Sequence, residues 1–173
     1  MSLSTTAPSP FARRTAHTTH SLLGGLILGA GYLAPIAARL AIAVPFLRSG
    51  LTKWNGWFHV SPVVDFLFES MFRLHLFGRT YPFPMPDVLA HLDAVAEVAL
   101  PILLIVGLAT RFSALGLLVM TAVIQLTVPS GWANFHLPWA ALALAIITLG
   151  PGPLSLDRLL ASAFRKRSAP DAL

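Results

Sequence analysis

Long runs of apolar residues, separated by short polar or aromatic boundaries, dominate the chain from residue 33 onward. A membrane-spanning helix needs about 20 mostly apolar residues at about 1.5 Å each, and four runs approach that length. Pro86 suits the start of the second helix, and the sequence GPG at 150–152 ends the fourth. The pattern predicts an all-α four-helix transmembrane bundle in one membrane domain over residues 21–160, with spans at residues 33–53, 87–108, 111–128 and 135–149.

The segment before the first run falls into two parts. Residues 1–20, MSLSTTAPSPFARRTAHTTH, are polar and rich in Ser and Thr, which is typical of a disordered tail. Residues 21–32, SLLGGLILGAGY, are apolar and Gly-rich but too short to span alone. They either lengthen the first helix or lie in the membrane interface, and the sequence leaves both interpretations open. The apolar run from Leu22 exceeds a signal-peptide core in length, so we expect it to be retained.

The longest segment outside the spans, residues 54–85, is crowded with aromatic residues. Ser61-Pro62 is a good helix start. Three charged residues then follow four positions apart and would share one face of a helix: Asp65, Glu69 and Arg73. We therefore expect an interfacial helix on the outer surface, which anchors the bundle or covers a cavity.

Lys and Arg predict the orientation of the spans. After the fourth span, Ser155 precedes LDRLLASAFRKR, which predicts a short basic amphipathic helix. This helix continues into a basic tail, which we place at residues 161–173. On that side of the membrane we count Arg13, Arg14, Arg111, Arg158, Arg165, Lys166 and Arg167, against Lys53, Arg73 and Arg79 on the other. Seven against three predicts that both termini are cytoplasmic.

Composition agrees with a lipid environment and narrows the chemistry. Hydrophobic residues make up 55% and charged residues 11% of the 173 positions, whereas soluble domains carry about 25% charged residues. The mean hydropathy is +0.73. The chain has no cysteine, which excludes thiol catalysis and thiolate metal sites by its own side chains. Its net charge of +5 fits basic segments beside anionic lipid better than nucleic-acid binding.

Five ionisable residues fall within or at the ends of the first two spans: Arg39, Arg48, Lys53, Asp93 and Glu97. A charge at mid-bilayer costs at least about 2.5 kcal/mol, so each must be paired, snorkelling or placed beside a functional cavity. Counting about 1.5 Å per residue from the cytoplasmic end predicts that Arg48 and Asp93 lie at the same depth. It also predicts that Arg39 approaches Glu97 from below. Arg39 and Lys53 are fourteen residues apart and share a face of the first span, so the two helices are expected to point opposite charges at one another.

These charges admit two interpretations, which the sequence leaves open. They form a buried ion-pair clamp that fixes the register of the helices, or they provide a proton-accepting carboxylate or an anchor for a quinone-like head group. No other cofactor is evident. His91, Gln125 and His136 are secondary candidates, of which Gln125 is expected to hydrogen-bond across the bundle. No spacing typical of metal ligands is present, so no metal site is expected.

The order of these residues resembles the bacterial DoxX family. Arg39 is followed by RSGLTK at 48–53, then by Glu97, which leads into PILLIVGLATR at 101–111, and finally by GPGPLSLD at 150–157. The resemblance covers roughly residues 33–160 and implies a four-span bundle in the inner (plasma) membrane of a bacterium. Arg39, Lys53, Glu97 and Arg111 match the charged positions of the family, whereas Asp93 departs from them. Members of the family are linked to membrane redox and thiol-stress complexes.

Three hypotheses of function follow. The first is a non-autonomous inner-membrane subunit that supports membrane redox or thiol chemistry beside a membrane or periplasmic redox partner, with a quinone docked near Glu97, Arg39 and Arg48. The second is a membrane scaffold or assembly factor, in which the charges only hold the bundle together. The third is a small proton-coupled transporter, for which four spans leave little room unless the protein forms a homo-oligomer.

Overall fold

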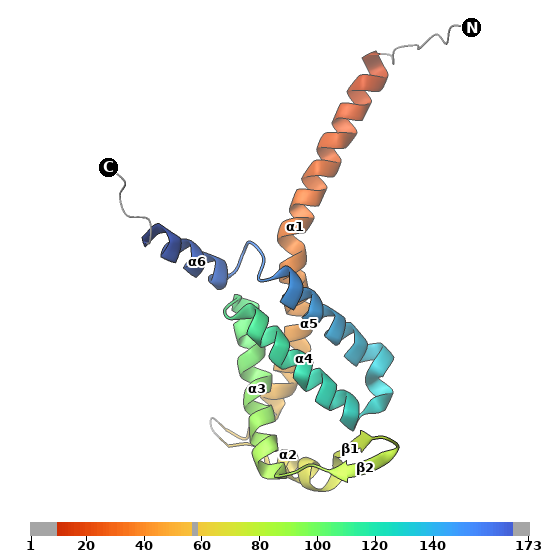
Figure 1. Cartoon of the computed structure of the whole chain (residues 1–173), viewed down its shortest axis with the longest axis vertical. Helices are drawn as coiled ribbons and strands as arrows, with labels where there is room; N and C mark the ends of the chain where they lie inside the picture. Colours follow the sequence, from red (N-terminus) through yellow and green to blue (C-terminus); the bar gives the residue numbers. More distant parts are fainter. Residues whose placement is uncertain (1–9, 57–58, 168–173) are drawn as a thin grey trace, which may run out of the picture. The chain divides into compact units, whose positions relative to one another are not determined.

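The computed structural model describes residues 10–56 and 59–167. Within these residues it consists of helices and one small two-stranded sheet (Figure 1). Four helical segments in this part are long and apolar enough to cross a membrane: Ile27–Thr52, Pro86–Val106, Thr110–Thr127 and Pro129–Leu149. The predicted all-α fold with four membrane helices is confirmed, although the first and fourth spans begin earlier than the sequence indicated.

The elements follow one another along the chain in a simple order. They are α1 (Pro10–Thr52), α2 (Pro62–Phe66), the π-helical turn η1 (Leu67–Met71), β1 (Arg73–Leu76), β2 (Arg79–Pro82), α3 (Pro86–Val106), α4 (Thr110–Thr127), the 3-10 turn η2 (Pro129–Gly131), the π-helical turn η3 (Trp132–His136), α5 (Leu137–Leu149) and α6 (Leu156–Arg167). We call the end of the spans that carries α2 and the two strands the loop end. The end that carries the α3–α4 turn and α6 is the tail end.

The start of α1 differs from the sequence prediction. Residues 10–20, expected to belong to a disordered tail, are helical, and α1 continues through residues 21–32 without a break. The latter segment therefore extends the first helix. Residues 1–9 and 168–173 of the two predicted tails lie outside the described residues, as do residues 57 and 58 of the aromatic segment. The chain divides into two compact units, residues 1–34 and 35–173, and the elements discussed below belong to the second.

The turn between α3 and α4 is held by a residue from far along the chain. Gly107 ends α3 in the left-handed conformation, with φ of 72°, which glycine adopts at little cost. Ala109 precedes α4 and has no side-chain acceptor for the free amides of the helix. Asp157 supplies both acceptors, because its Oδ1 lies 2.7 Å from the amide nitrogen of Ala109 and its Oδ2 lies 2.9 Å from that of Thr110. This contact fixes the start of α6 to the tail end.

Two apolar clusters hold the spans together. The first joins α1, α3, α4 and α5 through Ile42, Ala43, Phe46, Leu104, Ala114, Leu117, Ala143 and Ile146. The second packs residues 59–85, which we call the loop-end segment, against the first half of α3. Its buried residues are Val60, Val64, Phe68, Phe83, Ala90 and Ala94. Small residues recur at the contacts, as expected where membrane helices pack closely. The loop-end segment is therefore part of the packed structure.

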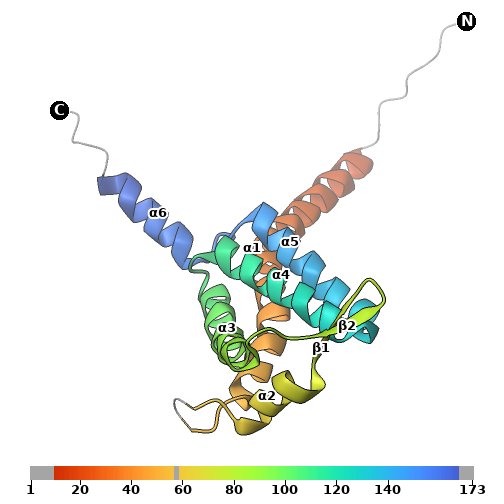
Figure 2. The same cartoon turned by 60° about the horizontal axis from the view of Figure 1, so that its bottom comes forward.

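The loop-end segment contains less helix than the sequence predicted. The expected face of Asp65, Glu69 and Arg73 would need one helix through all three residues, but the helix ends at Met71 and Arg73 begins β1. β1 and β2 form an antiparallel hairpin, turned at Phe77 and Gly78 with φ of 50° and 73°. The Nδ1 atom of His75 lies 3.0 Å from the carbonyl oxygen of Leu126, and so the hairpin is fixed against the end of α4. Figure 2 shows α2 and the hairpin across the ends of α3 and α4.

Candidate functional site

A close approach of two helix backbones brings the charged residues together. A Cβ atom on Gly50 would lie 2.8 Å from the carbonyl carbon and oxygen of Glu97, which is closer than real Cβ contacts. Glycine at this position therefore lets the last turn of α1 rest on the backbone of α3. Lys53, just beyond the end of α1, is thereby carried to the same level of α3 as Asp93 and Glu97.

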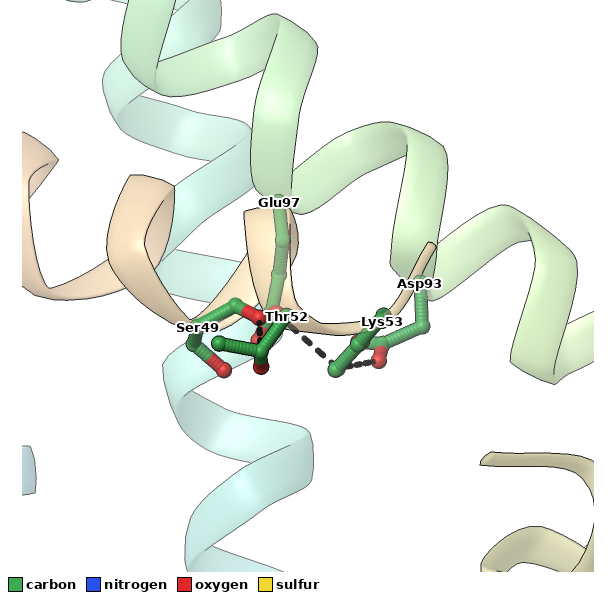
Figure 3. Close-up of polar contacts among 5 residues, drawn as sticks. All are labelled: Ser49, Thr52, Lys53, Asp93 and Glu97. Atoms are coloured by element: carbon green, nitrogen blue, oxygen red, sulfur yellow. Dashed lines mark hydrogen bonds and ion pairs between the residues drawn. The ribbon is translucent and has the colours of Figure 1, made fainter. Parts of the chain in front are cut away.

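Lys53 forms ion pairs with both carboxylates (Figure 3). Its Nζ atom contacts Asp93 Oδ2 and lies 2.9 Å from Glu97 Oε2. The two carboxylates are four residues apart and so share one face of α3. The side chain of Glu97 is 5% exposed, compared with 21% for Asp93. We call Lys53, Asp93 and Glu97 the charged triad.

The predicted contact of Lys53 with the carboxylates is confirmed, whereas the two partners predicted from depth, Arg48 and Arg39, were wrong. Arg48 is exposed and lies five residues before Lys53, which corresponds to a different face of the helix. Arg39 is buried at the tail end, where its Nη2 donates a hydrogen bond to the carbonyl oxygen of Leu154 at 2.7 Å. Equal depth in the membrane therefore did not identify the ion pair, because depth does not say which face of α1 meets α3.

An apolar cavity of about 690 Å³ adjoins the charged triad. Its polar wall holds the triad with Ser49, Thr52, Ser61 and Thr127. The remaining wall is apolar and comes from α2, η1, α3, α4 and the adjacent loops, including three aromatic residues: Phe68, Phe72 and Phe83. Leu92 of α3 and Val119 of α4 line the same cavity and are 59% and 56% exposed. The cavity is thus bounded partly by side chains on the exposed surface of the spans.

The helices α3 and α4 separate on the side where this cavity lies. Nearer the tail end, the side chain of Leu100 covers Gly116, where a Cβ atom would meet Leu100 Cδ1 at 2.6 Å. The two helices are close there, and Figure 1 shows them diverging from their shared turn toward the loop end. Ala96 and Met120, about one turn beyond this contact, line the cavity. The cavity therefore lies where α3 and α4 diverge.

A second polar cluster lies at the tail end and has a structural role. Burial raises the pKa of Asp157, but the hydrogen bonds from Thr110 and Ala109 and the positive charge of Arg39 outweigh that effect and lower the pKa below its usual value. The carboxylate therefore stays ionised and caps α4. Arg39 shares this cluster, so the buried arginine stabilises the junction of the helices at a distance from the cavity.

The secondary candidates lie apart from the charged triad. His136 is buried, and its Nδ1 atom lies 2.6 Å from Oε1 of Gln125. Gln125 thus hydrogen-bonds from α4 to η3, as predicted. His91 is exposed, and its Nδ1 lies 2.8 Å from the carbonyl oxygen of Asp87 in its own helix. Within residues 10–56 and 59–167, no group of three His, Asp or Glu residues is placed to hold a metal ion.

Several residues of the site were missed by the sequence prediction. Ser49 and Thr52 lie in the polar wall, and Thr52 donates its hydroxyl hydrogen to the carbonyl oxygen of Ser49 at 2.7 Å. Ser49 could have been found from its spacing, because residues four positions apart on a helix share one face. The aromatic wall gave no such signal, since the path of the loop-end segment depends on the hairpin that the sequence did not reveal.

A comparison with models of known families identifies the family of this chain. Residues 34–130 match the DoxX family. The chain is also 31% identical to an uncharacterized protein of Haemophilus influenzae over 153 residues, which is 82% of this chain and 91% of that protein. No solved structure gives a significant match. The matched region contains the charged triad and all of the residues that line the cavity. By these matches the chain belongs to the DoxX family of membrane proteins.

Proposed function

We propose that this DoxX-family protein binds an amphiphilic, quinone-type lipid and acts as a subunit that supports the redox chemistry of a partner protein. The observation that carries the proposal is the apolar cavity of about 690 Å³ with a charged triad in one wall. Binding sites for small molecules are mostly apolar, with a few polar groups that orient the ligand. A ring with polar substituents and an apolar tail matches that distribution.

The position of the cavity supports a ligand that arrives from the bilayer. Leu92 and Val119 contribute to both the cavity wall and the exposed surface of the spans. A tail could leave the cavity between α3 and α4 while the ring stays at the triad. The triad also meets the expectation that ionisable residues within a membrane serve a function.

The proposal moves the quinone site from its predicted position. Glu97 remains in the site, whereas Arg39 and Arg48 do not reach it, and Lys53 with Asp93 replaces them. The charged triad binds and orients the head group in this proposal. Electrons would come from the partner, since the chain has no cysteine and the proposal assigns its own side chains no redox role.

Equilibrium binding tests the proposal. The protein is reconstituted in nanodiscs, and a decyl-substituted benzoquinone is added over a range that covers micromolar dissociation constants. We expect saturable binding that weakens about 10-fold or more in Lys53→Met, because the buried carboxylates then lose their cation. Arg48→Met, an exposed cation nearby on α1, is the matched control and should bind as the wild type does. Partitioning without saturation, equal in all three proteins, would refute the proposal.

Localisation and partners form the second part of the proposal. The excess of Lys and Arg at the tail end supports cytoplasmic termini in a bacterial inner membrane. The hairpin would then face the periplasm, where its exposed tip at Phe77 could contact a redox partner. A scaffold role rests on this same exposed tip, and the nanodisc binding measurement separates the two. The scaffold hypothesis predicts co-purifying proteins that are lost on deletion of residues 74–81, together with no saturable quinone binding by the intact protein.

A further inference from the structure

The buried oxygen of Glu97 lacks a hydrogen-bond donor. Glu97 Oε2 lies 2.9 Å from Lys53 Nζ, within ion-pair distance, but the two atoms are not aligned for a hydrogen bond. The side chain is 5% exposed, and Glu97 lines the cavity. A buried acceptor without a donor is costly, because it has lost its hydrogen bonds to water. This oxygen is therefore an open acceptor in the cavity wall.

Part of the donor capacity of the polar wall is already used. Lys53 directs one of its three ammonium hydrogens to Asp93 Oδ2. The hydroxyl of Thr52 donates to the carbonyl oxygen of Ser49, and the hydroxyl of Thr127 donates to the carbonyl oxygen of Val123 at 2.9 Å. The hydrogens of these two hydroxyl groups are thus directed at acceptors of the protein.

The net charge of the cavity wall also favours a ligand that donates a hydrogen bond. The titratable side chains that line the cavity are Lys53 from the end of α1 and the two carboxylates of α3. The segments of α2, η1 and α4 that line it contribute none. Two carboxylates facing one ammonium leave an excess of acceptors and of negative charge. A ligand oxygen that carries a hydrogen would therefore be attracted more strongly than a bare carbonyl oxygen.

We infer that the cavity selects a head group that donates a hydrogen bond to Glu97 Oε2, so that the reduced dihydroxy form of a quinone-type lipid binds more tightly than the oxidised form. The inference rests on the proposed function for the class of ligand and adds the redox state that the site prefers. A phenolic hydroxyl is a good donor, and hydrogen bonds to ionised acceptors are about twice as strong as neutral ones. The protein would then hold quinol beside its partner and release the oxidised form.

Three matched ligands test this selectivity in nanodiscs under anaerobic conditions: decyl-hydroquinone, its dimethyl ether and decyl-benzoquinone. The ether retains the aromatic ring without the hydrogens, and the quinone adds no bulk. A hydrogen bond to a charged acceptor is worth about 10-fold or more in affinity. We therefore expect hydroquinone to bind at least about 10-fold more tightly than either of the other two ligands.

Two variants assign the selectivity to one carboxylate. In Glu97→Gln the ratio of hydroquinone to quinone affinity should fall to about 2-fold or less, because the amide also offers a donor to a carbonyl oxygen. Glu69→Gln, which removes an exposed carboxylate outside the cavity, should retain the full ratio. A ratio that stays unchanged in folded Glu97→Gln would overturn the assignment.

The wild-type protein alone distinguishes failure of the inference from failure of the proposed function. Saturable binding of hydroquinone and quinone with equal affinity would overturn the inference and leave the proposed function in place. Absence of saturable binding for all three ligands would overturn both. Neither result depends on whether Glu97→Gln folds.

Discussion

Replacing Gly50 with alanine tests how the charged triad is assembled. The new Cβ atom would lie 2.8 Å from the backbone carbon and oxygen of Glu97, whereas a relaxed contact needs about 3.5 Å or more. The neighbouring atoms belong to a helix backbone and cannot rotate away. The helices must therefore separate by about 0.7 Å, and Lys53 moves with α1.

The cost follows from two opposing effects. Overpacking of this kind destabilises a protein by about 1–3 kcal/mol. Alanine recovers about 0.5–1 kcal/mol through its better helix propensity. We expect Gly50→Ala to lose about 0.5–2 kcal/mol in free energy of unfolding and to bind the benzoquinone more weakly, since the triad is displaced.

A second glycine of the same helix provides the control. A Cβ atom on Gly29 would meet no atom within 4 Å, so Gly29→Ala should be neutral or stabilising and should bind ligand normally. The assay is reversible unfolding in mixed micelles, followed by circular dichroism, together with the nanodisc binding measurement. Equal stability and equal binding of Gly50→Ala and Gly29→Ala would refute the close approach as the origin of the site.

Three further predictions concern the rest of the structure. Because the pKa of Asp157 is lowered, its carboxylate stabilises the fold above the usual pKa near 3.8, and this contribution is lost as pH falls through the folded value; Asp157→Asn should cost about 0.5–2 kcal/mol at pH 7 and reduce the loss of stability on acidification. Gln125→Leu should cost about 1–3 kcal/mol by leaving buried His136 without its partner, and the double variant with His136→Phe should cost less than the sum of the single changes, as measured by unfolding. A fluorescent protein fused to the C-terminus should fluoresce in bacteria, and alkaline phosphatase inserted after Gly78 should be active, whereas the reverse pattern would contradict cytoplasmic termini.

The spans could be predicted from the sequence because each is set by a local property. An apolar run of membrane length has few alternatives to a transmembrane helix, since every backbone polar group must be paired inside the bilayer. The ends were less certain, because they depend on contacts that come later in the chain. Asp157, for example, caps α4 from 47 residues away through the amide of Thr110.

The hairpin was missed because its helical and extended interpretations compete over a short stretch. Arg73 follows Glu69 at helical spacing, and that spacing favoured a continued helix. The left-handed pair Phe77-Gly78 turns the chain instead, and strand pairing with contacts to α4 decides the outcome. Tertiary contacts of this kind are absent from a local pattern.

Only part of the site could be predicted from the sequence, for a similar reason. Helical geometry alone places Asp93 and Glu97 on one face, and both contact Lys53 in the structure. The choice of Lys53 over Arg48 depends on how α1 rotates against α3, which the contact at Gly50 helps to determine. A glycine gives little signal in a sequence until the helix that packs against it is known.

The central claim is that the cavity between α3 and α4 holds an amphiphile, and photocrosslinking tests it most directly. A hydroquinone with a diazirine on its alkyl tail is irradiated with the protein in nanodiscs, and labelled residues are located by mass spectrometry. The account predicts labels concentrated at Leu92 and Val119, which excess unlabelled hydroquinone removes. Labels spread evenly over exposed residues of the spans, including Leu144 of α5, and insensitive to competition would contradict it.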